Sequence, residues 1–217
     1  MVKLRVLISM ELEGVTNVQP ADDHYEYFFT VSRQPPKVSA PKGSASKGCA
    51  PVENQYTRSS DNTNILIPSQ VMCGSCREVH SKTVSLNQKD EHEISGSKGK
   101  ASFVWRCSNC KKEHSANFLP SAPPPSKSKS TAPIPYTSSA SGQFSPFIAL
   151  DCRGLEFTEF HFAGKWKAEG EESGAAFDID WDQLRKEQGG EERWDDYDED
   201  GGVAVAVSEL KSKIERA

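Results

Sequence analysis

Four cysteines of the chain stand in two pairs, each with two residues between the sulfurs. The first pair is Cys73 and Cys76 in VMCGSC, and the second is Cys107 and Cys110 in RCSNC. Such a pair is typical of a zinc knuckle, a tight turn that places two thiolates on one cation while backbone N–H groups point at the sulfurs. Two knuckles complete a tetrahedral four-cysteine shell. Four thiolates leave no position for water, so the pattern predicts one structural Zn²⁺ per chain.

The knuckle turns and the spacer between them are compatible with this site. Gly74 and Asn109 suit the two turns, because glycine and asparagine accept positive φ at low cost. The spacer between the pairs is longer than the usual length of about 15–20 residues. Residues 78–86 and 101–106 look extended, so we expect the spacer to contain strands.

The same spacing is also compatible with an iron–sulfur cluster, with another metal, or with a redox dithiol. A redox CxxC motif needs a helix N-terminus after a strand, where the helix dipole lowers the pKa of one thiol. CGSCREVH and CSNCKKEH do not lead into helical patterns, and a thioredoxin-like site uses only one such motif. Zinc is therefore the favoured interpretation.

Three further residues are weaker candidates for metal ligands. His80 and His114 each follow a knuckle by four residues, and either could replace a thiolate. A solvent-facing position on a strand is the favoured interpretation for both histidines. Cys152 is expected to be a small buried core residue.

The acidic run EERWDDYDED, residues 191–200, is a weaker candidate for a cation site. We expect it to be a solvated loop that Trp194 and Tyr197 attach to the body of the protein. The sequence contains no nucleophile–base arrangement, P-loop or dinucleotide fingerprint, so we expect no enzymatic activity.

Length, composition and charge limit the class of protein. The chain has 217 residues, of which 35% are hydrophobic, and a net charge of -5; its mean hydropathy is -0.63. Part of it is therefore expected to lie outside any core, and nucleic acid is disfavoured as a partner. No apolar run approaches the length of about 18 residues that a membrane helix needs. Without a recognisable signal peptide, a cytoplasmic location is expected, with the nucleus as a second possibility, and closely spaced cysteines there favour metal binding.

The fold class expected from hydrophobic alternation is mainly all-β. We expect an N-terminal β half over 1–119 that carries the zinc site, a Pro/Ser-rich loop over 120–145, and a C-terminal β half without metal over 146–217. VSELKSKIERA at the C-terminus could add a short helix. The alternating segments are KLRVLISMELE, YEYFF, SFVWRC and GVAVAVSEL.

Residues 31–70 interrupt this pattern with a Ser-, Pro-, Asn- and Lys-rich stretch. It is either a disordered insert or a retained intron. The intron interpretation rests on its ends, because Val-Ser and Gln can be encoded by the nucleotides that usually begin and end a eukaryotic intron. Deleting it joins YEYFFT to VMCGSC as one continuous strand. The intron interpretation is favoured, and Cys49 is then expected to have no role.

A short internal repeat suggests that the fold consists of two similar β halves packed together, of which only the first carries the cysteine pairs. ISMELEGVT at 8–16 aligns without gaps with IALDCRGLE at 148–156, and each reads as a strand that ends in a Gly turn. The aligned pairs include Ile8 with Ile148, Met10 with Leu150, Glu11 with Asp151, Gly14 with Gly154 and Val15 with Leu155.

Several segments resemble the eukaryotic family of CXXC motif containing zinc binding proteins. They are LEGVTNVQP, CGSC, GSKGKAS before WRCSNC, LDCRGLEF, AEGEESGAAF and WDDYDE, in this order. The resemblance implies two related β-sandwich-like halves with one zinc ion on the two CxxC pairs, which match Cys73, Cys76, Cys107 and Cys110. Phe157 and Lys100 depart from the family pattern without touching these ligands, and the family lacks a long insert before the first knuckle.

Three functions are compatible with these features. The first is a non-enzymatic, zinc-stabilised interaction or adaptor module, expected to be monomeric and to bind protein partners rather than nucleic acid or membrane. The second is a metal-handling protein that exchanges zinc or copper with a client. The third, least favoured, is a thiol redox enzyme.

Overall fold

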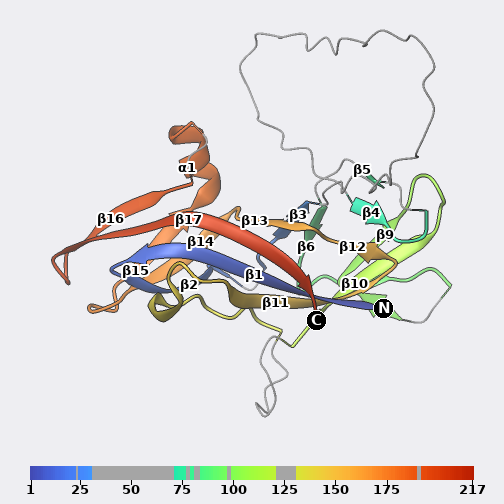
Figure 1. The fold of residues 1–217 in the computed structure, drawn as a ribbon, viewed down its shortest axis with the longest axis horizontal. Helices are drawn as coiled ribbons and strands as arrows, with labels where there is room; N and C mark the ends of the chain where they lie inside the picture. Colours follow the sequence, from blue (N-terminus) through green and yellow to red (C-terminus); the bar gives the residue numbers. More distant parts are fainter. Residues whose placement is uncertain are drawn as a thin grey trace, which may run out of the picture. The chain divides into compact units, whose positions relative to one another are not determined.

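The structure is a computed structural model whose described residues carry almost all of the segments discussed above. These residues are 1–22, 24–30, 71–76, 79–80, 84–96, 99–120, 131–189 and 192–217. The predicted insert at 31–70, with Cys49, lies outside them. Within the described ranges the chain is dominated by antiparallel strands, which confirms the predicted all-β class (Figure 1).

A six-stranded antiparallel sheet takes strands from both ends of the chain. Its order is β16-β17-β1-β11-β10-β9. Both predicted segments, 1–119 and 146–217, contribute to it. The strands are β1 (Val2–Glu13), β9 (Phe103–Arg106), β10 (Glu113–Leu119), β11 (Ser145–Arg153), β16 (Trp194–Asp198) and β17 (Val203–Arg216).

Smaller sheets accompany the large one. The orders of the three-stranded sheets are β12-β4-β5, β13-β3-β6 and β15-β14-β2, and β7 pairs with β8. The strands are β2 (Val15–Pro20), β3 (Tyr27–Thr30), β4 (Val71–Cys73), β5 (Val79–His80), β6 (Val84–Leu86), β7 (His92–Glu93), β8 (Lys100–Ala101), β12 (Leu155–Glu156), β13 (Glu159–His161), β14 (Lys165–Gly170) and β15 (Ala176–Asp180).

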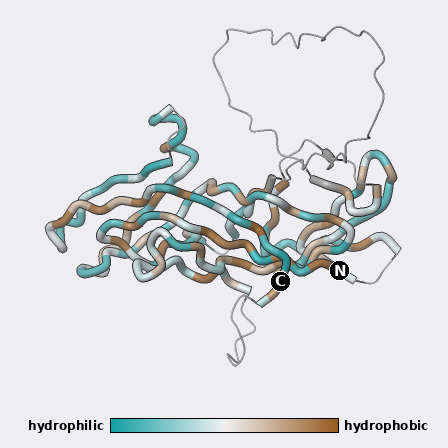
Figure 2. Tube along the Cα trace, in the orientation of Figure 1, coloured by the Kyte–Doolittle hydropathy of each residue, from teal (hydrophilic) through white to brown (hydrophobic). Residues whose placement is uncertain are grey.

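The core lies between the large sheet and the smaller ones. Along β1 the side chains of Leu4, Val6, Ile8 and Met10 are buried, as alternation on a strand with one core face requires. They share one hydrophobic cluster with aromatic residues of the small sheets. Hydrophobic and hydrophilic stretches accordingly alternate along the trace (Figure 2). The aromatic members include Tyr27, Phe29, Phe160 and Trp166.

The helical content differs from the prediction. A seven-residue helix, α1 (Trp181–Glu187), is capped by Asp180, whose side chain accepts hydrogen bonds from two backbone N–H groups of the first turn. The helix suggested for VSELKSKIERA is wrong, because these residues belong to β17, which pairs with β1 as far as Arg216. A short 3-10 turn, η1, covers Ser138–Ala140. No helix in the described ranges is long and apolar enough to cross a membrane.

Candidate metal centre

The first knuckle is positioned by pairing between β4 and β12. Cys73 ends β4 opposite Leu155, and the N–H of Gly74 donates to the carbonyl oxygen of Gly154 at 2.6 Å. A Cβ on Gly74 would lie 2.7 Å from that oxygen. Gly74 does not have positive φ, so close backbone approach, rather than the predicted conformational freedom, requires glycine here.

The second knuckle is the turn of the β9–β10 hairpin. Cys107 follows β9, and the N–H of Cys110 donates to its sulfur at 3.4 Å, as expected for a knuckle. The turn closes with a hydrogen bond from the N–H of Lys111 to the Cys107 carbonyl at 3.0 Å. Lys111, with φ of 60°, takes the left-handed conformation that we had assigned to Asn109.

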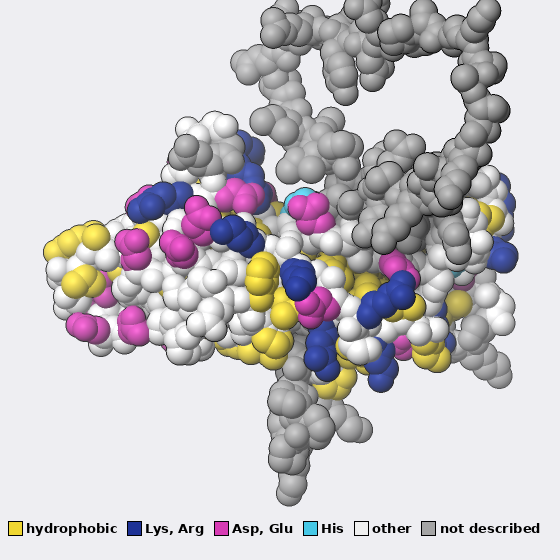
Figure 3. Space-filling model, in the orientation of Figure 1, with side chains coloured by type: hydrophobic (Ala, Val, Ile, Leu, Met, Phe, Trp, Pro, Cys, Tyr) yellow, Lys and Arg dark blue, Asp and Glu magenta, His cyan; other side chains and the backbone are white. Residues whose placement is uncertain are grey.

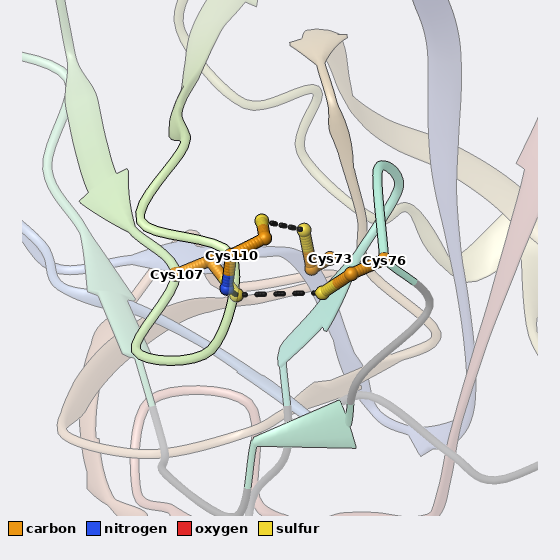
Figure 4. A group of neighbouring side chains, drawn as sticks. All are labelled: Cys73, Cys76, Cys107 and Cys110. Carbon is orange, nitrogen blue, oxygen red and sulfur yellow. Dashed lines mark hydrogen bonds between the residues drawn. The ribbon is translucent and has the colours of Figure 1, made fainter.

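The four sulfurs converge on one point (Figure 4). All of them lie within 4.8 Å of one another, with 3.5 Å between Cys73 and Cys110 and 3.6 Å between Cys76 and Cys107. A tetrahedral zinc site with bonds of about 2.3 Å has sulfurs about 3.8 Å apart. The four predicted ligands therefore come together, in a geometry and with a donor set that fit one zinc ion.

Burial differs between the two members of each pair. Cys73 and Cys107 are fully buried, whereas Cys76 and Cys110 are half-buried. Burial raises the pKa of the Cys73 thiol to about 11. A raised pKa is the reverse of what a redox thiolate needs, and in the part of the chain that the structure describes neither knuckle precedes a helix. Coordination to a metal would deprotonate the thiol despite its burial.

His114 lies beside the site without being one of its four ligands. Its Nε2 is 3.0 Å from the sulfur of Cys73, a distance that fits an N–H donor on a metal-bound thiolate. The ring is 4% exposed and stacks on Trp105 with centroids 5.5 Å apart. Burial, and less so the charge of Lys112, lowers the pKa of His114. The solvent-facing position favoured for this histidine is therefore wrong.

The glycine after β11 makes room for this imidazole. A Cβ on Gly154 would overlap Nδ1 of His114. Gly154 has φ of 79°, so it is required both for its conformation and for space. The sequence predicted the Gly turn but not its contact with His114, because β10 and Gly154 come together through pairing between strands that are far apart in the chain.

Of the remaining candidates, those whose side chains the structure describes do not join the site. Cys152 is completely buried, as predicted. For His80 the structure describes only the backbone, in β5. The predicted acidic loop is in part strand β16, in which Trp194 is buried and Tyr197 is 55% exposed. Only Trp194 therefore anchors this segment as predicted.

Comparisons with known sequences point to one family. A model of the CXXC motif containing zinc binding proteins of eukaryotes matches residues 48–215. A UPF0587 protein of Schizosaccharomyces pombe is 31% identical over 159 residues, which cover 72% of this chain and 87% of the relative. The human CXXC motif containing zinc binding protein is 31% identical over 142 residues, which cover 65% of this chain and 78% of the relative.

Solved structures share the fold. The crystal structure of C1orf123 superimposes with a TM-score of 0.66 and 23% sequence identity, covering 99% of each chain. A hypothetical protein from Plasmodium falciparum gives a TM-score of 0.64 at 18% identity, covering 99% of this chain and 100% of the other.

Proposed function

The chain belongs to the eukaryotic family of CXXC motif containing zinc binding proteins, and from this premise we propose that it is a non-enzymatic interaction module held in shape by zinc. The observation that carries the proposal is the closed four-thiolate site. With all four positions taken by protein, zinc acts as a cross-link and activates no water.

The cross-link joins parts of the chain that share few other contacts. One knuckle follows the three-residue strand β4, and the other closes the β9–β10 hairpin at the edge of the large sheet. A three-residue strand such as β4 contributes little stability on its own. Zinc would therefore keep a surface built from both knuckles in one conformation for a partner.

The proposed partner is a protein, and the proposed state of the chain is a cytoplasmic monomer. On the face drawn in Figure 3, Lys and Arg side chains are interspersed with Asp and Glu. Together with the net charge of -5, this mixed surface supports a protein partner over nucleic acid, which would favour a continuous basic area.

A second candidate, metal handling, is favoured by one observation. Cys76 and Cys110, one from each knuckle, are half-buried whereas Cys73 and Cys107 are buried, which favours these two residues as the thiolates that a client protein would approach. Exchange of a metal begins by replacing an accessible thiolate with a ligand of the acceptor.

Chelator competition separates the two functions. Purified protein is mixed with a chromogenic chelator, and zinc release is followed together with proteolysis of segment 71–119. For a structural zinc, release is slow and coincides with the appearance of protease sensitivity. Rapid release from a chain that stays protease-resistant contradicts the proposal and supports metal handling. Affinity purification with wild type and a variant lacking the four cysteines then identifies partners that depend on the zinc-bound surface.

A further inference from the structure

β1 and β11 lie side by side at the centre of the large sheet, and the strands around them form two matching series. β17 and then β16 lie beyond β1, while β10 and then β9 lie beyond β11. Each central strand ends at a glycine with positive φ, Gly14 at 65° and Gly154 at 79°, before β2 or β12 begins. A Cβ on Gly14 would meet Val205 of β17, as one on Gly154 would meet His114 of β10. The two series therefore follow the same plan.

The small sheets extend the match to the first knuckle. β14 pairs with β2 as β4 pairs with β12, with Gly170 opposite Val15 and Cys73 opposite Leu155. In both sheets, the N–H of the residue that follows Gly170 or Cys73 donates to the carbonyl oxygen of the glycine that ends the central strand. These hydrogen bonds run from the N–H of Glu171 to the oxygen of Gly14 at 2.9 Å, and from the N–H of Gly74 to the oxygen of Gly154 at 2.6 Å. Gly170 thus occupies the position of Cys73, which places Ser173 at the position of Cys76.

The hairpins extend the match to the second knuckle. In the β16–β17 turn, the N–H of Gly202 donates to the carbonyl of Asp198 at 2.7 Å, and Gly202 has φ of 66°. In the β9–β10 turn, the N–H of Lys111 likewise donates to the carbonyl of Cys107, and Lys111 also has positive φ. The N–H of Gly201 donates to Oδ1 of Asp198 at 2.9 Å, as that of Cys110 donates to the sulfur of Cys107. Asp198 thus occupies the position of Cys107.

Side chains at two of these counterpart positions meet directly. Oγ of Ser173 donates to Oδ2 of Asp198 at 2.5 Å, where Cys76 and Cys107 face each other across the zinc site. Asp198 is only 1% exposed. The remaining two positions are Gly170 and Gly201, and a Cβ on Gly170 would overlap Oγ of Ser173 and lie 2.6 Å from Oδ2 of Asp198.

We infer that the Ser173–Asp198 hydrogen bond is the metal-free counterpart of the zinc centre. It joins the turn after β14 to the β16–β17 hairpin, as zinc joins the turn after β4 to the β9–β10 hairpin. A hydrogen bond to a carboxylate is charge-assisted and stronger than a neutral one. Glycine at the other two positions leaves the hydroxyl and the carboxylate room to meet directly, so this end of the protein folds without an ion.

The inference predicts that cysteines at the four counterpart positions create a second zinc site. Neither Gly170 nor Gly201 has positive φ, so their backbone accepts cysteine. We expect G170C/S173C/D198C/G201C to bind two zinc ions per chain, measured by metal analysis and native mass spectrometry. The matched control is G170C/S173C/D198C, which keeps Gly201, lacks the fourth thiolate, and is expected to hold its additional zinc far more weakly against a chelator. A folded four-cysteine variant with one zinc overturns the inference.

If the four-cysteine variant does not fold, S173A/D198A in the native background decides the question. We expect it to retain one zinc per chain and to become protease-sensitive within 165–202, while 71–119 stays protected. The control is Asp196→Ala, an exposed acidic residue of the same hairpin, which should change neither property. Protease resistance of 165–202 equal to wild type, or loss of the zinc, contradicts the inference. Neither result bears on whether the protein is an interaction module.

Discussion

His114 and Cys73 are 41 positions apart in the chain, yet Nε2 of the histidine lies 3.0 Å from the cysteine sulfur. A site of four thiolates and one Zn²⁺ carries a net charge of -2, and it is stabilised by N–H donors around the sulfurs. The N–H of Cys110 supplies one such donor to Cys107. His114 is positioned to supply another, and burial lowers the pKa of its side chain.

Replacing this histidine is expected to weaken zinc binding without abolishing it. His114→Phe keeps a ring of similar size against Trp105 but removes the donor to Cys73. Loss of such an outer partner typically costs about 10–100-fold in metal affinity. Competition with a chelator of known affinity measures the change. The control is His92→Phe on the exposed strand β7, and equal affinities for the two variants would exclude a role for the hydrogen bond.

Removing a ligand is expected to have a much larger effect. Structural zinc contributes about 10–16 kcal/mol of apparent binding free energy in small zinc peptides at neutral pH, which is similar to the net stability of a whole domain. A serine hydroxyl stays protonated and ligates zinc poorly, so Cys73→Ser or Cys107→Ser should lose the zinc ion. Segment 71–119 should then become protease-sensitive while 146–217 remains resistant. Zinc content equal to wild type would refute the four-cysteine site.

Cys152 offers the matched control for the ligands, because it is a fully buried cysteine outside the cluster. Burial raises the pKa of its thiol to about 12, so it remains protonated and unreactive at neutral pH. Cys152→Ala should destabilise the protein by about 1 kcal/mol through lost apolar volume and leave zinc content unchanged. Denaturant unfolding and metal analysis provide the two measurements. A zinc-free variant would mean that Cys152 supports the site.

The cluster of four cysteines and the β class could be predicted because both depend on local sequence patterns. CxxC spacing specifies each knuckle, and alternation specifies strands such as β1. The role of His114 could not be predicted in this way. Whether a strand histidine faces solvent or a metal depends on register and partner, which form through contacts far apart in the chain.

The C-terminal strand illustrates the same limit. VSELKSKIERA is compatible with a helix locally, yet it adopts β17 because β1 offers a long hydrogen-bonding edge from Leu4 to Glu13. Tertiary pairing therefore overrides a weak local preference. The same long-range pairing makes both ends of the chain part of one sheet.

Strand pairing on either side of residues 31–70 predicts that a shortened chain folds. β3 and β4 flank this segment, and they pair with β13 and β12, which are themselves separated only by residues 157–158. Thr30 pairs with Glu159, and Met72 pairs with Glu156. After deletion of 31–70, Thr30 and Met72 would be two positions apart in the chain, whereas their partners Glu159 and Glu156 are three positions apart. One β-bulge accommodates this difference of one residue.

The variant lacking 31–70 should therefore bind one zinc ion and unfold at a denaturant concentration close to that of the full chain. Metal analysis and denaturant unfolding test this. Failure to bind zinc would show that the segment is needed for the site. Transcript sequencing addresses the origin of the segment separately, since a dominant message that retains these codons would contradict the intron interpretation.

Acid should weaken the turn that holds Asp198. Hydrogen bonds from Ser173, and then from the backbone N–H of Gly201, lower the pKa of this carboxyl below its ordinary value of 3.8. A group whose pKa is lower in the folded state contributes stability that is complete above its unfolded pKa and is lost as the pH falls toward the folded value. The loss for Asp198 should therefore begin near pH 3.8 and continue below it.

Asp198→Asn removes this titration. Its single amide oxygen can still accept from the N–H of Gly201 in the place of Oδ1, whereas the NH2 group in the place of Oδ2 no longer accepts from Ser173. The stability of this variant relative to wild type should be lowest at neutral pH, where wild type has the charged acceptor, and the difference should shrink as the pH falls below about 4. Denaturant midpoints measured from neutral to acidic pH give this difference directly, with Asp196→Asn as the exposed control on the same strand. A difference that is constant with pH would mean that the carboxylate charge contributes nothing to the link between the β14 turn and the β16–β17 hairpin.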